Sequence, residues 1–243
     1  MFDLQTFSLT QMTELGSSLR KLGEGAQSME EAANRVVRYL YEHLLTESGR
    51  QNECVLVRLF KTHPYRELDE TLRESADKML GGATVSPAMK CLVLVATAGD
   101  RPEWNVRAVS KGHKAIPLPS EKAIESFPMI SRLVSQLGLS AHVLLRADPT
   151  LMLNMKERSF NVFHVPEAQG SPYVPAQAEF VIPYHVKSVL GFGGLLPTAD
   201  LFAVIMFARV HITRETAELF NTLALSVKLA MIPFAAKVFD STV

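Results

Sequence analysis

The run Val189-Leu-Gly-Phe-Gly-Gly-Leu-Leu196, followed by Leu201-Phe-Ala-Val-Ile-Met-Phe-Ala208, decides the fold. Both runs are apolar and have the length of a strand, and residues 196–200 between them predict a turn. Two strands joined by a turn pair antiparallel. A helix is predicted next, because Thr213 can cap its first turn and Glu215 places a carboxylate where the helix dipole favours one.

Working outward from this end, the rest of the chain alternates strand-like and helix-like patterns. Short turns join most of the strands, so the sequence predicts an α+β fold with a central, mainly antiparallel sheet and helices on one face. Because Pro128 lies inside the third helical region, two short helices or a kink are expected there. Predicted strands are 53–60, 90–96, 104–109 as the hairpin partner of 90–96, 160–165 and 179–185; predicted helices are 28–45, 65–80 and 120–137.

The first 27 residues carry a narrow apolar stripe. Its members, spaced as on one side of a helix, are Leu9, Met12, Leu15, Leu19 and Leu22. We therefore expect residues 1–27 to form a helical leader or linker, with a frayed leader as the alternative. Ser28 and Glu31 have capping-box spacing, which starts the domain proper at 28–243.

Composition excludes several classes of function. Twenty-five basic and 25 acidic side chains cancel, which removes the positive footprint of a nucleic-acid binder and any attraction to an anionic membrane. The longest apolar run, 201–208, is far short of the roughly 20 residues of a membrane span, so none is expected. Cys54 and Cys91 lie in apolar strands, which indicates buried, reduced thiols and a cytoplasmic protein.

The pattern of the last 60 residues resembles the close of a GAF domain. The strand 189–196, the return strand 201–208 and the helix beginning Ile212-Thr-Arg-Glu-Thr-Ala-Glu-Leu-Phe carry the resemblance. The helix at 28–45 is similar to the opening helix of that family, and Ala115-Ile-Pro-Leu-Pro119 is similar to its middle. The resemblance implies a sensory domain of the kind found in bacterial signalling proteins.

The chain departs from the family pattern in several places, and these departures limit what the resemblance implies about a ligand. A helix stands between the first two strands where the family has a tight turn, and a long loop follows Val165. The Asn-Lys-Phe-Asp-Glu signature of cyclic-nucleotide-binding members is absent, and so are cysteines suited to a bilin or to sulfoxide reduction. The resemblance therefore implies the fold and a sensory role, and no particular ligand.

One group of residues is a candidate ligand site. His164 ends a predicted strand, Tyr173 lies in the Pro-rich loop 166–177, and Tyr184 and His185 end the next predicted strand. The alternative is that a histidine at a strand end is structural. Haem ligation by one imidazole is a further possibility for the cofactor. No metal-ligand spacing and no catalytic motif are present.

The final helix is apolar nearly all round, which is typical of a helix buried on two sides. We expect its second side, with the leader, to form a symmetric homodimer; the alternative is burial beneath the N-terminal helix of the same chain. The interface residues predicted for the dimer are Leu15, Leu19, Leu219, Leu225, Leu229 and Ile232.

The function predicted from these patterns is a non-catalytic sensory module that binds a ligand and dimerises. It would serve as the input domain of a longer signalling protein, with a downstream signalling domain as partner. Two alternatives stay open: a small-molecule enzyme on a GAF-like fold, and a dimerisation scaffold without a ligand. A well-formed cavity separates the first two readings from the third.

Overall fold

The computed structural model describes residues 1–46, 48–86, 88–145 and 161–240. The elements and their bounds are α1 (Leu9–Lys21), α2 (Met29–His43), β1 (Cys54–Pro64), η1 (Tyr65–Glu67), α3 (Glu70–Leu80), β2 (Lys90–Gly99), η2 (Pro102–Trp104), β3 (Ala115–Leu118), α4 (Glu121–Glu125), α5 (Pro128–Gln136), α6 (Ala141–Leu145), β4 (Phe163–Val165), η3 (Gln177–Val181), β5 (Ser188–Leu195), β6 (Leu201–Ala208), α8 (Arg214–Met231) and η4 (Ile232–Phe234).

The strands form one six-stranded sheet in the order β3-β2-β1-β6-β5-β4. Every pairing is antiparallel, including the tight β5–β6 hairpin in which Leu195 faces Leu201. The central pair, β1 and β6, are far apart in sequence, so an early and a late segment of the chain meet at the middle of the sheet. The predicted α+β class with an antiparallel sheet is confirmed.

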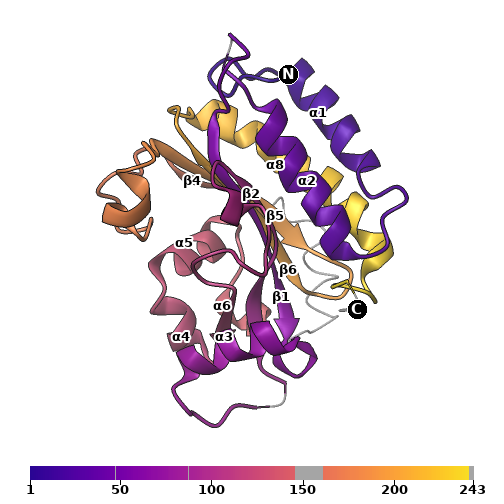
Figure 1. Cartoon of the computed structure of the whole chain (residues 1–243), viewed down its shortest axis with the longest axis vertical. Helices are drawn as coiled ribbons and strands as arrows, with labels where there is room; N and C mark the ends of the chain where they lie inside the picture. Colours follow the sequence, from indigo (N-terminus) through magenta and orange to yellow (C-terminus); the bar gives the residue numbers. More distant parts are fainter. Residues whose placement is uncertain (47, 87, 146–160, 241–243) are drawn as a thin grey trace.

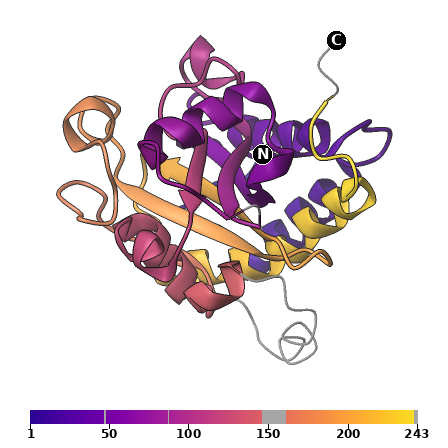
Figure 2. The same cartoon turned by 90° about the horizontal axis from the view of Figure 1, so that it is seen from below.

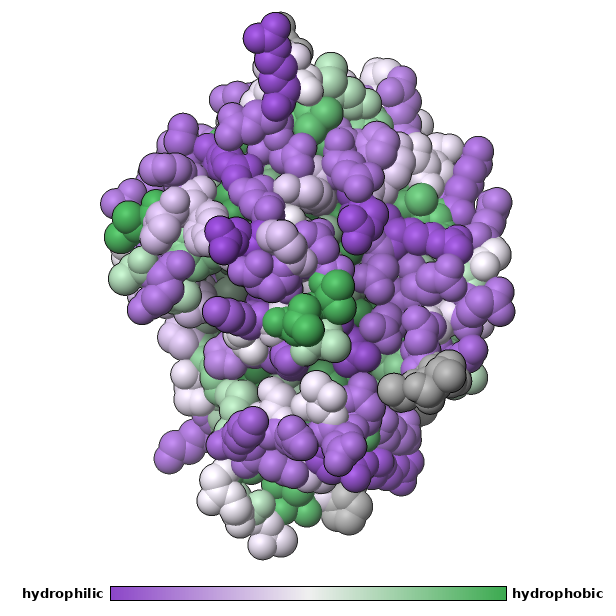
Figure 3. All heavy atoms as spheres, in the orientation of Figure 1, coloured by the Kyte–Doolittle hydropathy of each residue, from purple (hydrophilic) through white to green (hydrophobic). Residues whose placement is uncertain are grey.

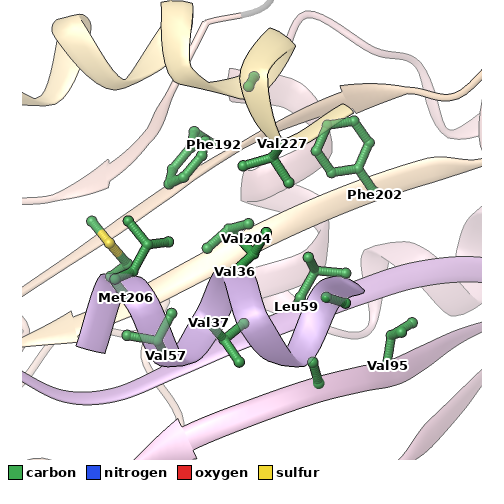
Figure 4. Packing of buried hydrophobic residues seen from close by; sticks show 14 of the residues in the cluster. Val36, Val37, Val57, Leu59, Val95, Phe192, Phe202, Val204, Met206 and Val227 are labelled. Carbon is green, nitrogen blue, oxygen red and sulfur yellow. The ribbon is translucent and has the colours of Figure 1, made fainter. Parts of the chain in front are cut away.

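Both faces of the sheet are buried, and side chains alternate between them as the pleat requires. On β6, Phe202, Val204 and Met206 enter one core, which α2 and α8 complete (Figure 4). The alternate residues of the same strand enter a second core on the opposite face: Leu201, Ala203, Ile205 and Phe207. Burial on both faces explains why β6 is an uninterrupted apolar run, with no alternation of polar residues.

The helices cover both faces of the sheet, which corrects the expectation that they lie on one. Figures 1 and 2 show α1, α2 and α8 gathered on one side of the molecule, with α4 and α5 apart from them. Ile124 of α4 and Leu133 of α5 belong to the second core, with Ile205 of the sheet. Pro128 begins α5 at its first turn, where its missing amide donor costs nothing. Of the two outcomes expected there, the structure shows two short helices, α4 and α5.

The N-terminal segment packs into the same core as the rest of the chain. Phe7 lies on Phe220 of α8 with ring centroids 4.9 Å apart, and Leu4 is fully buried. At Gly23, just after α1, a Cβ would stand 2.2 Å from the carbonyl oxygen of Ala230, so only glycine permits this approach to α8. Residues 1–27, expected as a leader ahead of the domain, are therefore an integral part of its helical layer.

The expectation that no segment can span a bilayer stays a prediction, because the C-terminal helix meets the length and composition of a span. Residues Arg214–Phe234 form a helix long and apolar enough to span a membrane by length and composition, and an 18-residue window within it has a mean hydropathy of 1.3. In this fold the helix lies between the sheet and α1. Its buried side chains include Phe220, Leu223 and Val227.

Two predicted strands are wrong. Residues 104–109 form a turn, because the side chain of Asn105 bonds to Gly99 and Arg101, and β3 takes the place beside β2. Residues 179–185 instead continue a π-helical turn that begins at Gln177. Phe180 and Tyr184 then project together, four residues apart, onto Trp104.

Both cysteines are fully buried free thiols, as predicted. Burial raises the pKa of Cys54 far above its usual value and raises the pKa of Cys91 to about 12. Neither thiol can form the reactive thiolate at neutral pH.

Candidate functional site

A mainly apolar cavity lies on the second face of the sheet, between α5 and the loop 166–177. Its volume is about 180 Å³. That is close to the roughly 150 Å³ of an apolar cavity that takes up benzene. Its lining residues are Arg58, Phe60, Leu92, His113, Ile116, Phe127, Pro128, Met129, Ile130, Leu133, Pro172, Pro175, Ile205 and Phe207; we call it the Arg58 cavity.

Arg58 is the charged group of this cavity. It sits mid-strand on β1, between Val57 and Leu59, which face the other core. Its Nη2 donates to Ser110 Oγ at 3.0 Å and to the carbonyl oxygen of Lys111 at 2.9 Å. Its Nε is buried without a hydrogen-bond partner. Burial lowers the pKa of Arg58 to about 10, so the guanidinium remains charged at neutral pH.

No carboxylate of the described residues forms an ion pair with Arg58. His113, the other polar lining residue, is exposed, and its ring centroid lies 6.2 Å from that of Phe127. Partial burial, together with the charge of Arg58, lowers the pKa of His113. The cavity therefore offers an unneutralised cation, a neutral imidazole and otherwise apolar walls.

The Pro-rich loop 166–177 contributes Pro172 and Pro175 to the cavity. Tyr173 lies between them in sequence and packs beneath the guanidinium of Arg132 of α5, 4.8 Å from the ring centroid. The amide of Gln177 holds the loop together by donating to the carbonyl oxygens of Ala168 and Val174. Tyr173 thus anchors the loop to α5 and is not itself among the lining residues.

His164 lies on the opposite face of the sheet from Tyr173. It is 8% exposed, and its neighbours Phe163 and Val165 on β4 enter the second core, so its ring points toward α8. There Nε2 donates to the carbonyl oxygen of Ile212 at 2.9 Å, and burial lowers the pKa of the ring. The imidazole ties β4 to the start of α8, which is the structural alternative, and its Nε2 is not presented to a haem.

Tyr184 and His185 also lie away from the Arg58 cavity. Tyr184 packs on Trp104 with ring centroids 4.8 Å apart. His185 is exposed, on a turn with φ of 55°. The structure therefore does not bring the four predicted ligand residues together.

The residues predicted for the dimer interface divide into three kinds. Leu15 and Leu19 are fully buried against α8 of the same chain, so they cannot reach a partner. Leu219 and Ile232 are partly buried. Leu225 and Leu229 project from α8 into solvent, 58% and 44% exposed. The two-sided burial inferred from the helix pattern is met mainly within the chain, by the sheet and α1.

Sequence reasoning missed the Arg58 cavity. The available signal was Glu53-Cys-Val-Leu-Val-Arg-Leu-Phe60, in which one arginine interrupts an otherwise apolar strand. A charged residue at such a place needs a partner, a route to water or a ligand. Among the described residues no three histidine, cysteine, aspartate or glutamate side chains are grouped to hold a metal ion.

Comparison with known proteins yields a fold likeness alone. No family model matches the chain, and no curated protein matches it. Among solved structures it is similar to the GAF domain of a phosphoenolpyruvate-protein phosphotransferase from Coxiella burnetii, with 15% identity, a TM-score of 0.45 and 91% coverage of each chain. The strand order and flanking helices show an α+β domain with a central antiparallel sheet, which is the class that the sequence predicts. The likeness carries no inference about ligand, activity or partner.

Proposed function

We propose that this domain is a non-catalytic sensory module whose Arg58 cavity binds a small organic anion. The ligand would place an apolar ring or short chain between the sheet and α5, with its negative group on the guanidinium of Arg58. The observation that supports this most is the uncompensated charge of Arg58 in a cavity whose other walls are almost entirely apolar. An anion would supply the missing partner for the unbonded Nε.

The ligand class follows from size and charge together. A cavity of about 180 Å³ accommodates a body the size of one aromatic ring. Charge-assisted bonds from a guanidinium to a carboxylate give both orientation and selectivity. Benzoate is therefore a suitable probe, and benzamide, with nearly the same shape and no charge, is its matched control.

The test compares both probes on wild-type protein and on Arg58→Met by calorimetric titration. We expect wild-type protein to prefer benzoate over benzamide by about tenfold or more, and Arg58→Met to lose that preference. Ligand-free Arg58→Met should be at least as stable as wild type, because it removes a half-buried, unpaired charge.

Lys122→Met is the control variant, because it removes an exposed charge from α4 outside the cavity lining. It should keep the preference for benzoate. Equal affinity of wild-type protein for benzoate and benzamide would refute an anion site at Arg58.

A homodimer is a second proposal, supported by Leu225 and Leu229. They lie one turn apart on α8 and are both exposed, which leaves an apolar pair in water. We expect sedimentation to report a dimer, and Leu225→Glu with Leu229→Glu to convert it to a folded monomer. Val106→Glu, at an exposed valine elsewhere, should leave the dimer intact. Wild-type protein that sediments as a monomer at high concentration would end this proposal.

Apart from this apolar pair, the surface that Figure 3 shows is typical of a soluble protein. Figure 3 shows a largely hydrophilic face with small, separated apolar patches. The cytoplasm is the compartment we propose, because the two buried cysteines are unpaired thiols. A downstream signalling partner also belongs to the proposal.

A further inference from the structure

A second cluster of charged residues lies near the C-terminal end of β1. We call it the Lys61 cluster: Lys61 of β1, Lys90 of β2, and Asp200 before β6, with Thr62 and Thr198. Lys61, Lys90 and Asp200 are 2%, 7% and 8% exposed. Three ionised side chains are therefore held almost entirely out of water.

Asp200 has no bonding capacity left in this cluster. Its two oxygens accept from Lys61 Nζ and Lys90 Nζ, each at 2.9 Å, and from the hydroxyl groups of Thr198 and Thr62 at 2.8 and 3.3 Å. Although burial acts to raise it, the pKa of Asp200 is lowered by the two ammonium groups. Asp200 is therefore ionised and fixed in place, and it is one carboxylate between two ammonium groups.

The two lysines keep both charge and donors to spare. Lys61 Nζ uses one further bond, to the carbonyl oxygen of Thr62 at 2.8 Å, and an ammonium group has three donors. Two buried cations thus face a single buried carboxylate. Burial, and then the charge of Lys90, lowers the pKa of Lys61 against the attraction of Asp200. The cluster as a whole lacks one negative charge.

A cavity of about 440 Å³ opens on this cluster, lined by Lys61, His63, Thr198, Asp200, Lys237 and Phe239 among others. Glu67 also lines it, but its side chain is half exposed and pairs with Arg66 at 3.3 Å. Lys237 adds a further cation. The charges around the space, with Lys90 behind it, are three ammonium groups and two carboxylates.

His63 supplies an independent sign that a group is missing. It is 6% exposed and lines this cavity, and its Nδ1 is buried without a hydrogen-bond partner. Burial, with the charge of Lys61, lowers the pKa of His63 to about 4, so the ring is neutral at physiological pH. A buried polar nitrogen beside unused ammonium donors is an unsatisfied arrangement that a ligand with oxygen atoms would complete.

The C-terminal segment Ala235–Phe239 roofs the cavity. Phe239 packs edge-on to His63, with ring centroids 5.3 Å apart, and lies under Arg107. The segment is pinned to the start of α2, where the amides of Met29 and Glu30 donate to the carbonyl oxygens of Lys237 and Val238. The segment is therefore fixed to α2 by backbone hydrogen bonds, and it lines the same cavity as Lys61 and Asp200.

We propose that this cavity is a binding site for a phosphate group, held between Lys61 and Lys237 beside His63 and beneath Phe239. A phosphate supplies the missing negative charge and several acceptor oxygens for the unused lysine donors. The site is separate from the Arg58 cavity and does not depend on what binds there.

The test uses inorganic phosphate as the probe, with sulfate and chloride at matched ionic strength. We expect phosphate to raise the thermal midpoint of wild-type protein above that in chloride, and phosphorus NMR to show binding. Lys61→Met leaves Lys90 and Asp200 as a balanced pair, so it should fold and bind phosphate about tenfold more weakly. Lys237→Met, at an exposed position, tests the site without touching the buried cluster and should also weaken binding.

Two comparisons decide the outcome. Arg58→Met should keep the full phosphate response, which separates this site from the one proposed for organic anions. Lys111→Met removes an exposed lysine elsewhere and should also have no effect. The proposal is overturned if phosphate stabilises no more than chloride, or if wild-type, Lys61→Met and Lys237→Met bind it equally.

Discussion

Gly193→Ala is expected to destabilise the domain by more than about 3 kcal/mol, the upper end for forcing one extra carbon into a packed interior. Gly193 lies on β5 opposite Ala203 of β6. A Cβ built there would stand 2.1 Å from the carbonyl oxygen of Phe202 and 2.9 Å from the Cα of Ala203. Both are backbone atoms of β6, so the clash can be relieved only if β5 and β6 move apart and their hydrogen bonds break.

Gly82→Ala is the matched control, because it makes the same chemical change where a Cβ meets nothing within 4 Å. Its φ of 85° makes alanine strained there, at a cost of about 1 kcal/mol. Urea unfolding of the two variants measures the difference. A Gly193→Ala midpoint as high as that of Gly82→Ala would contradict the close strand packing on which the sheet is built.

Glu53→Gln is expected to remove a loss of stability that wild-type protein suffers as the pH rises. Glu53 is fully buried; its Oε2 accepts from the amide of Leu4 at 2.6 Å, and its Oε1 has no partner. Burial, with the charge of Asp3 adding to it, raises the pKa of Glu53 from 4.5 to about 7. The native state therefore holds a proton that the unfolded chain has already released.

The sign follows from that difference in bound protons. Below pH 4.5 the carboxyl is protonated in both states, and its stabilising contribution is fully present. Between about pH 4.5 and pH 7 the unfolded chain ionises first, so stability falls by up to about 3 kcal/mol, at 1.36 kcal/mol per pKa unit. Above pH 7 the loss is complete.

The measurement is the free energy of unfolding of wild type and Glu53→Gln from pH 4.5 to 8. The lowered pKa of His63 acts in the opposite direction between about pH 4 and 6.5, but it is common to both proteins and cancels in the difference. We expect the free energy of unfolding of Glu53→Gln to increase relative to that of wild type as the pH rises from 4.5 to about 7. A difference that does not change with pH would show that Glu53 ionises normally.

The elements that sequence predicts well are those whose pattern is local. The β5–β6 hairpin, the start of α8 at Thr213 and the start of α2 at Ser28 each carry their own turn or cap, and all three are observed. The side chains of Ser28 and Thr213 accept from backbone amides three residues on, as predicted. Local chemistry decides these boundaries, so one sequence is enough to find them.

The errors arise where distant contacts decide. Residues 179–185 have a strand-like composition, yet Phe180 and Tyr184 reach Trp104 only through a helical turn. The apolar stripe of α1 predicts in part contact with a second subunit, but Leu15 and Leu19 are buried against α8 of the same chain. Periodicity shows that a face is buried without showing what covers it.

The candidate sites were also beyond the sequence for a physical reason. Arg58 and Pro172 are 114 positions apart in the numbering, and only the sheet and the loop 166–177 bring them to one cavity. Likewise Lys61 and Asp200 meet because β1 and β6 are neighbours at the centre of the sheet. Residues 166–177 form a loop, as the sequence predicts; Pro172 and Pro175 line the cavity and Tyr173 contacts α5.

The most direct test of the sensory account is a methyl NMR titration of the wild-type protein with benzoate. The Arg58 cavity is bordered by methyl groups of Leu92, Ile116, Ile130 and Leu133, whereas Leu59, Val204 and Leu223 lie in the core on the other face of the sheet. We predict saturable shifts in the first group and little change in the second. Shifts centred on the second group, or none in either, would contradict a ligand cavity at Arg58.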